Sequence, residues 1–481
     1  MDQSTASDTR GAQLLDHLRR EIRRRRPGER LPSTRALVEQ HRVSPVTVSR
    51  SLAALSSEGL IVTRPGAGSY VAGPGAGTVE RPPADYSWQT VMLGTRPVDT
   101  GGLAQVMRAG EDDEGMSLAL GYLHPSLVPT KALAGALARA GRLPDAWDRP
   151  PPGGLHGLRA WFARSAGAGI DPNDVIVTPG GQGSISTVLR GMLSGGDALL
   201  VESPTYPGAV AVARMAGIRV VPVPTDRDGL IPELLAEAFA RTGARAVYCQ
   251  PTFHNPTGSV LPPERRRAVL EVAAAAGAFV VEDDFARWLG HGTPVPPPLV
   301  TDDVEGRVVS ITSLTKTIAP SLRIGAIIAR GPIAARLRAM RVVDDMFVSR
   351  PLQQATVELV SGPAWPRHLR QLQAALAGRQ RALSRALATT LPAVRVGWLP
   401  AGGMHLWVRL PDGVDDATLA ETAARRGVLV GAGRPFFPAE PLGAYLRLTF
   451  SGVATEADLA EAVSRLALAA PELTSGPDRV S

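Results

Sequence analysis

The chain has 481 residues, of which 44% are hydrophobic and 20% charged. This length allows about two to four domains, and the absence of any apolar run of about 18 residues excludes a membrane-spanning helix. The single cysteine, Cys249, excludes an internal disulfide and argues against a zinc site. Because the first ten residues are polar and lack an apolar signal core, we expect a cytoplasmic protein.

The positive charge is concentrated near the N-terminus. Residues 1–72 contain 12 arginines and 7 acidic residues, so +5 of the chain's net +7 lies there. A small basic head on a nearly neutral body is typical of a module that binds a polyanion. We therefore assign a head to residues 1–72, a Gly/Pro-rich linker to residues 73–110 and a body to residues 111–470. Within the linker, residues 87–93 are expected to form a short docking helix.

The head is predicted to contain a helix-turn-helix followed by a β-wing. Ser33 and Ser44 are good N-caps for two short helices joined by a tight turn, and Pro45 suits the first position of the second helix. Residues 60–64 and 69–71 flank a glycine-containing turn and are expected to pair as strands. Such a winged helix places its second helix in the major groove of DNA; a winged helix used only for protein contacts is the alternative.

One segment of the head, residues 27–72, carries a family resemblance. Its sequence, PGERLPSTRALVEQHRVSPVTVSRSLAALSSEGLIVTRPGAGSYVA, resembles the DNA-binding head of the GntR family almost throughout. The resemblance implies that double-stranded DNA is the partner of the head. The residues that would face DNA are Arg35, Ser44, Thr47, Arg50, Arg64 and Gly66.

The body alternates apolar, strand-like runs with Ala-, Leu- and Arg-rich helical stretches, which predicts an α/β sheet. Several of the predicted strands end in polar segments, at the edge of the sheet where ligands gather. The Gly-rich turn at residues 179–183 precedes a helix and offers backbone N–H groups to a phosphate. Tyr206 can stack on a flat ring, and Asn255 can donate a hydrogen bond to a phenolate oxygen. A plain strand–helix turn and a packed loop tyrosine are the alternatives.

The segment 313–325 contains Lys316, one of only two lysines among the 52 basic residues. Lysine can form an imine once its amine is deprotonated, whereas arginine cannot. Neighbouring hydroxyls and Arg323 are suited to a bound phosphate. Asp283, at the end of a buried strand, would be satisfied by a protonated pyridine nitrogen. Together these residues point to pyridoxal 5'-phosphate (PLP); an ordinary loop lysine on a basic surface is the alternative.

In this order and spacing, the segments of the body resemble the fold-type I aminotransferases, which have a large and a small domain. The resemblance implies a Schiff base between PLP and Lys316. It also implies that Asp283 pairs with the pyridine nitrogen, that Asn255 bonds the ring oxygen and that Tyr206 stacks on the ring. The phosphate would be held by Gly181, Gln182, Ser313 and Arg323. Near the C-terminus, the segment LRLTFS resembles the one whose arginine grips a substrate carboxylate, which assigns that role to Arg447.

A GntR-like head joined to an aminotransferase-like body resembles the MocR family of transcriptional regulators over almost the whole chain. The resemblance implies a homodimer that reads two DNA half-sites and senses PLP or an amino compound, and no membrane partner. A catalytically active aminotransferase is the alternative. The related enzymes commonly have a tyrosine at the position of Phe285, and many have another tyrosine at the position of Arg149. Because phenylalanine cannot bond the ring oxygen, we favour regulation over enzymatic turnover. Such a regulator could still carry out a residual half-transamination.

Overall fold

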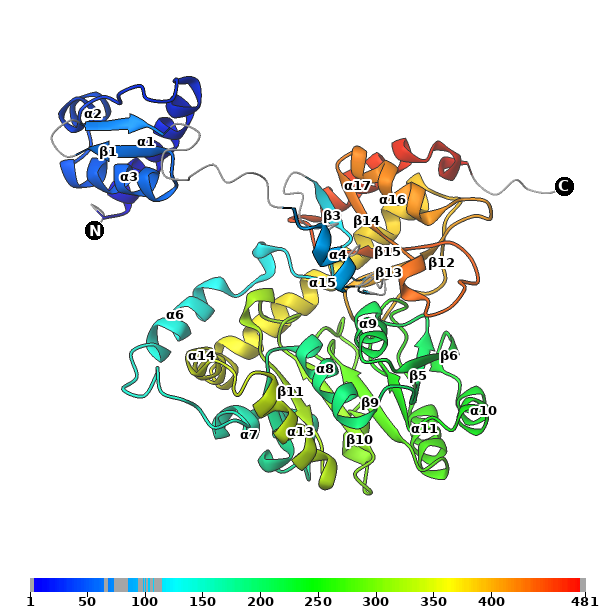
Figure 1. Cartoon of the computed structure of the whole chain (residues 1–481). Coiled ribbons are helices and arrows are strands. Elements are labelled where there is room, and N and C mark those ends of the chain that lie inside the picture. Colours follow the sequence, from blue (N-terminus) through cyan, green and yellow to red (C-terminus); the bar gives the residue numbers. More distant parts are fainter. Residues whose placement is uncertain are drawn as a thin grey trace. The chain divides into compact units, whose positions relative to one another are not determined.

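The computed structural model describes residues 4–64, 68–72, 85–93, 98, 100, 103, 107 and 115–475, with only the backbone at residues 4–12 and 90 (Figure 1). The chain divides into two compact units, Met1–Pro97 and Val98–Ser481, which are described separately. The boundaries expected for head, linker and body stay predictions, and most of residues 73–110 lie outside the described residues.

The head has the predicted helix-turn-helix followed by a two-stranded antiparallel wing. Ser33 Oγ accepts a hydrogen bond from the Ala36 N–H at 3.2 Å, and Ser44 Oγ accepts one from the Thr47 N–H at 3.1 Å, so both predicted N-caps are confirmed. The elements are α1 (Ser4–Arg24), α2 (Thr34–His41), α3 (Pro45–Ser57), β1 (Ile61–Arg64) and β2 (Gly68–Val71).

A small apolar core holds the three helices and the wing of the head together. Leu18, Val48 and Leu55 have no exposed surface, and Leu37 and Ile61 are also buried. Burial of this apolar surface is the main stabilising contribution in such a small unit.

Farther along the chain, helix α4 (Ser87–Leu93) forms where a short helix was predicted, and its apolar side chains are exposed.

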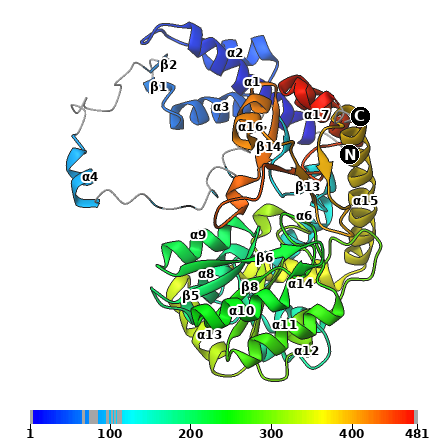
Figure 2. The ribbon, with the colours of Figure 1, turned by 90° about the vertical axis from the view of Figure 1, so that its right-hand side faces the viewer.

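The large domain of the second unit is built on an eight-stranded sheet (Figure 2). Five adjacent strands, in the order β10-β9-β8-β5-β6, run parallel, while β11 is antiparallel to its neighbours β10 and β4, and β7 is antiparallel to β6. The strands in sheet order are β4 (Val175–Thr178), β11 (Gly325–Ile328), β10 (Val308–Ser313), β9 (Phe279–Asp284), β8 (Ala246–Cys249), β5 (Ala198–Ser203), β6 (Arg219–Asp226) and β7 (Gly229–Leu230).

Helices cover both faces of this sheet because its strands are apolar on both faces (Figure 2). On β10, for example, Val308 belongs to one apolar cluster and its neighbour Val309 to the other. The helices of the large domain and its flanks are α6 (Thr130–Ala140), α7 (His156–Ala166), α8 (Gly181–Met192), α9 (Pro207–Met215), α10 (Pro232–Thr242), α11 (Pro263–Ala275), α12 (Leu299–Asp302), α13 (Pro332–Asp344) and α14 (Arg350–Ser361).

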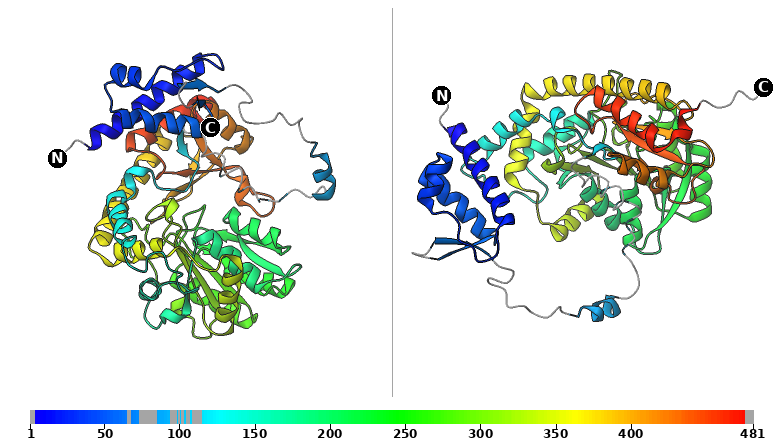
Figure 3. Two further views of the ribbon diagram at one scale, coloured as in Figure 1. Left: turned by 60° about the vertical axis from the view of Figure 1, so that its left-hand side comes forward. Right: turned by 90° about the horizontal axis from the view of Figure 1, so that it is seen from above.

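The small domain has a five-stranded sheet with its own core, and the long helix α15 packs beside α17 (Figure 3). In sheet order the strands are β12 (Arg395–Val396), β13 (His405–Arg409), β15 (Tyr445–Thr449), β14 (Val428–Ala432) and β3 (Met116–Leu118). Its helices are α15 (Ala364–Thr390), α16 (Asp416–Arg425) and α17 (Glu456–Ala469). The predicted α/β class is therefore confirmed.

No helix within the described part of the chain is long and apolar enough to cross a membrane.

Candidate functional site

One pocket of the second unit gathers every residue that was predicted to hold PLP or a carboxylate. The large sheet contributes residues that follow its strands, and the small sheet contributes His405 and Arg447. This is the edge at which ligands bind in parallel sheets, since loops from neighbouring strands converge there. The predicted residues that line it are Gly181, Gln182, Tyr206, Asn255, Asp283, Ser313, Lys316, Arg323 and Arg447.

Lys316 lies just beyond the end of β10 and points its amine into the pocket. Its Nζ donates a hydrogen bond to the Gly121 carbonyl oxygen at 2.7 Å and lies 3.6 Å from the centre of the Tyr122 ring. Burial, helped by the positive charges of Arg447 and Arg323, lowers the pKa of Lys316 to about 7. A substantial fraction of the amine is therefore uncharged near neutral pH, which is the form that attacks a carbonyl.

Asp283 lies near the end of β9 and is held by two donors. Its Oδ2 accepts hydrogen bonds from the Tyr248 hydroxyl at 2.6 Å and from Gln250 Nε2 at 2.8 Å. Burial raises the pKa of Asp283 to about 6, while these two hydrogen bonds act in the opposite direction. The carboxylate remains mostly ionised at neutral pH, and it suits a cationic partner in the pocket.

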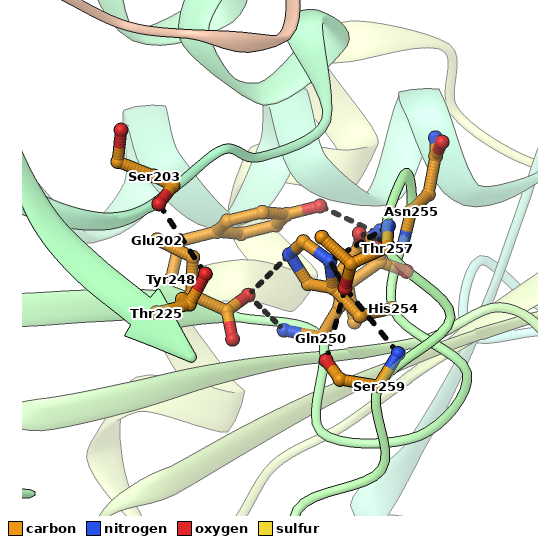
Figure 4. Close-up of polar contacts among 10 residues, drawn as sticks. Glu202, Ser203, Thr225, Tyr248, Gln250, His254, Asn255, Thr257 and Ser259 are labelled. Carbon is orange, nitrogen blue, oxygen red and sulfur yellow. Dashed lines mark hydrogen bonds and ion pairs between the residues drawn. The ribbon is translucent and has the colours of Figure 1, made fainter. Parts of the chain in front are cut away.

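The polar network behind the pocket fixes the loop that follows β8 (Figure 4). Glu202 Oε2 accepts a hydrogen bond from the Gln250 N–H at 2.7 Å and lies 3.3 Å from His254 Nε2. On its other side, His254 Nδ1 lies 2.8 Å from Thr257 Oγ1. His254 is thus engaged within the loop, by Glu202 on one side and Thr257 on the other.

Arg447 on β15 is buried without a carboxylate partner among the described residues. Its guanidinium donates hydrogen bonds to Asn255 Oδ1 at 3.2 Å and to the Ala119 carbonyl oxygen, and it lies 4.8 Å from the centre of the Phe436 ring. The Nε atom has no hydrogen-bond partner. Burial lowers the pKa of Arg447 to about 10, so the group still carries its charge at neutral pH.

A second polar cluster surrounds the N-terminus of α8. Arg323 donates a hydrogen bond to the Pro179 carbonyl oxygen at 2.7 Å, and a side chain at Gly180 would approach its guanidinium to 3.0 Å. Gly180 has a positive φ of 89°, which only glycine adopts readily. Ser313 and the first turn of α8 line the same end of the pocket. Helix N-termini with nearby arginine and hydroxyl groups bind anions.

Tyr206 lies at the start of α9 with its ring in the pocket. Its hydroxyl donates a hydrogen bond to Gln182 Oε1 at 3.0 Å. Burial raises the pKa of Tyr206, so the phenol stays neutral. A Cβ atom at Gly208 would lie 2.4 Å from this ring, so the ring position requires glycine there.

Sequence reasoning missed several residues that line the pocket or support it. The hydroxyl of Thr315 is buried and has no hydrogen-bond partner in the part of the chain that the structure describes. Its position next to Lys316 in the sequence could have identified it as a pocket residue. His405 bonds Thr449 through Nδ1 at 2.7 Å, and burial together with the charges of Arg447 and Lys316 lowers its pKa. It comes from the small sheet, where no local pattern marks it. Tyr122, Tyr248 and Gln250 likewise had no distinguishing sequence signal.

In the head, the side chains predicted to face DNA lie on α2, α3 and the wing. Arg35, Arg50 and Arg64 are exposed, and Arg64 lies 5.0 Å from the centre of the Tyr70 ring. Ser44, the exposed N-cap of α3, and Thr47, half-buried in its first turn, have their hydroxyl oxygens 2.8 Å apart. Gly66 lies outside the described residues.

Two protein-family models match the chain and divide it in the same way as the fold does. The model described as aminotransferase class I and II matches residues 133–466, and the model of bacterial regulatory proteins, gntR family, matches residues 11–71. Fold and site thus define a GntR-type helix-turn-helix head fused to an aminotransferase-like body.

Full-length relatives carry the same combination. The HTH-type transcriptional regulator TauR of Rhodobacter capsulatus is 29% identical over 92% of both chains, and the uncharacterized HTH-type transcriptional regulator YdfD of Bacillus subtilis is 26% identical over 93% of both. A solved structure of LysN, an alpha-aminoadipate aminotransferase from Thermus thermophilus complexed with N-(5'-phosphopyridoxyl)-L-leucine, matches with a TM-score of 0.72 at 28% identity, covering 78% of this chain and 96% of that one. The chain belongs to the MocR type of transcriptional regulators, as its sequence predicted.

Proposed function

We propose that this regulator holds PLP covalently on Lys316 and binds double-stranded DNA through its head. An amino-acid-like effector in the pocket, with its carboxylate on Arg447, changes the affinity for DNA. A ligand shifts such an equilibrium only by its differential affinity for the two arrangements. The working unit in this proposal is a homodimer, so that two heads read two half-sites.

The observation that carries the proposal is the charge balance of the pocket. Its described lining contains the cationic side chains of Lys316, Arg323 and Arg447 and the single carboxylate of Asp283. Arg447 is buried among neutral oxygens, which is costly for a cation, and an anionic ligand relieves that cost. The phosphate of PLP and the carboxylate of an amino acid are anions of the right kind, and they would occupy opposite ends of the pocket.

The side chains fit PLP group by group. When bound, PLP supplies an aldehyde that condenses with a primary amine and an electron-withdrawing ring. In this proposal the lowered pKa of Lys316 makes its amine available, Asp283 pairs with the ring nitrogen, Asn255 donates to the ring oxygen and Tyr206 stacks on the ring. The phosphate would be held by Gly181, Gln182, Ser313 and Arg323. The phosphopyridoxyl-leucine in the LysN relative supports this assignment.

The head carries +5 of the chain's net charge of +7, which suits the phosphate backbone of DNA. In this proposal α3 enters the major groove and the wing reaches the adjacent backbone. The residues assigned to this surface are Arg35, Ser44, Thr47, Arg50, Arg64 and Gly66.

The proposal is tested by locating the covalent bond. The protein is incubated with PLP, reduced with borohydride and digested, and the phosphopyridoxyl peptide is mapped. A tag on Lys316 is the expected result, whereas no tag, or a tag on Lys131, contradicts the proposal. In parallel, a labelled fragment from upstream of the gene should shift with the protein, and the shift should respond to PLP in the wild type but not in Lys316→Ala.

A second candidate function is catalytic turnover as an aminotransferase, which the intact arrangement around Lys316 favours. Phe285 weighs against it, because this residue lines the pocket with a carbon ring and offers no hydroxyl. Sustained turnover of an amino acid and keto acid pair would establish the enzyme; a reaction that stops after one half-transamination, or no reaction, supports regulation.

A further inference from the structure

Gln250, the first residue after β8, is buried, and its backbone N–H and both ends of its side-chain amide make hydrogen bonds. Its backbone N–H donates to Glu202 Oε2 at 2.7 Å, which fixes the start of the loop. Its side-chain Nε2 donates to Asp283 Oδ2 at 2.8 Å, and its side-chain Oε1 accepts from the Asn255 N–H at 3.1 Å. The two ends of one amide therefore hold two different residues of the pocket.

The orientation of this amide is determined by its partners. An ionised carboxylate only accepts hydrogen bonds and a backbone N–H only donates, so Nε2 must face Asp283 and Oε1 must face Asn255. Reversing the amide would place two acceptors together at Asp283 and two donors together at the Asn255 N–H. Fully paired buried groups of this kind are rigid.

The hydrogen bonds continue beyond Gln250 in both directions. On one side Asp283 is also held by the Tyr248 hydroxyl at 2.6 Å. On the other side Asn255 Oδ1 accepts from Arg447 at 3.2 Å. A continuous path thus joins Asp283 on the large sheet to Arg447 on the small sheet, and Gln250 is the residue at its middle.

We propose that Gln250 is a positioning residue that sets both the carboxylate of Asp283 and the loop amide of Asn255. Through these two residues it governs the fit of the PLP ring and of the effector carboxylate. The inference rests on the proposed function, since it assigns PLP to Asp283 and the carboxylate to Arg447.

Each end of the amide has a separate consequence. The donor end stabilises the ionised form of Asp283 against the effect of burial, and the ionised form is the one that pairs with a protonated ring nitrogen. The acceptor end keeps the Asn255 loop in place, and this loop holds the guanidinium of Arg447. Loss of the donor end should weaken PLP binding, and loss of the acceptor end should weaken carboxylate binding.

Two substitutions separate the ends. Gln250→Leu removes both, whereas Gln250→Glu keeps an oxygen for the Asn255 N–H and replaces the donor with a group that repels Asp283 at pH 8. The matched control is Gln353→Leu: Gln353 is also fully buried and bridges two backbone groups, but it does not line the pocket. PLP affinity is measured by absorbance titration. Carboxylate affinity is measured calorimetrically on the PLP-saturated protein with 4-methylpentanoate, which has no amine to react.

We expect Gln250→Leu to lower both affinities by about tenfold, as for loss of a hydrogen bond to a charged or positioned group. Gln250→Glu should lower the PLP affinity at least as much at pH 8, while its affinity for 4-methylpentanoate stays within about threefold of wild type. The PLP affinity of Gln250→Glu should recover at lower pH, where the introduced carboxyl can donate to Asp283. Gln353→Leu should leave both affinities unchanged, whatever its effect on the unfolding temperature.

A Gln250→Leu variant that binds both ligands as the wild type does would overturn the inference, as would an equal loss of carboxylate binding in both Gln250 variants. Wild-type protein that is not labelled on Lys316 after borohydride reduction would instead overturn the proposed function itself. A cooperative thermal unfolding transition of each variant, followed by circular dichroism, reports that the body has folded.

Discussion

Arg447 on the small sheet donates a hydrogen bond to the side-chain oxygen of Asn255, which follows a strand of the large sheet, at 3.2 Å. The two residues are far apart in the sequence, and their contact closes one side of the pocket. The guanidinium makes its other hydrogen bond to a backbone carbonyl oxygen and leaves Nε without a partner. A buried cation satisfied only by neutral oxygens is prepared for an anion.

The first prediction concerns this guanidinium. Arg447→Ala should weaken binding of 4-methylpentanoate to the PLP-loaded protein by about 100-fold, or ~3 kcal/mol, because a bidentate charged contact is lost. PLP affinity should change little, since the phosphate is proposed to be held by Arg323 and the first turn of α8 rather than by Arg447. The control is Arg409→Ala, an exposed arginine on the same sheet that pairs with Asp412. Equal effects of the two substitutions would contradict the assignment.

The second prediction follows from the pKa of Lys316, which burial lowers from 10.5 to about 7. The amine must be uncharged to attack PLP, so the rate of attachment should rise about tenfold per pH unit below pH 7 and level off above it. Stopped-flow absorbance between pH 5.5 and 9 measures this. A rate that keeps rising to pH 9 would mean an amine with an ordinary pKa.

The same lowered pKa extends the second prediction to the stability of the PLP-free protein as a function of pH. Between pH 7 and 10.5 the unfolded chain keeps the Lys316 proton while the folded chain has lost it. The unfolded state thus binds more protons, so this residue makes the free energy of unfolding rise with pH across that window. Lys316→Met should remove this slope in urea titrations, whereas Lys131→Met, at the exposed second lysine, should retain it.

The sequence was sufficient for the parts of the site that follow local rules. Ser33 and Ser44 could be recognised as helix caps because a cap depends only on the next three residues. Lys316 and Asp283 could be recognised because Lys316 follows an apolar strand and Asp283 lies near the end of one, in a chain that resembles a known family. His405 and Gln250 could not, since their importance arises from contacts with residues distant in the sequence. Side-chain partners of this kind are fixed by tertiary packing, which no local pattern encodes.

The third prediction concerns the head. Arg50→Ala should weaken binding to the upstream DNA fragment by about tenfold and reduce the dependence on salt by about one phosphate contact, if its guanidinium meets the backbone. PLP absorbance should be unchanged, because the head and the pocket belong to separate units. Arg385→Ala, an exposed arginine of the body, is the control. Loss of PLP absorbance together with DNA binding would argue against a modular protein.

The fourth prediction tests the ring of Tyr206 through a neighbouring glycine. A Cβ atom at Gly208 would lie 2.4 Å from the ring and 2.6 Å from Gln182 Oε1, so Gly208→Ala must displace the ring that is proposed to stack on PLP. We expect PLP affinity to fall by about tenfold, corresponding to the loss of a stacked aromatic contact of ~1.4 kcal/mol. Gly153→Ala is the matched control, because nothing lies within 4 Å of its Cβ position and its backbone is not left-handed. If absorbance titrations give the same PLP affinity for both variants, the stacking role of Tyr206 is wrong.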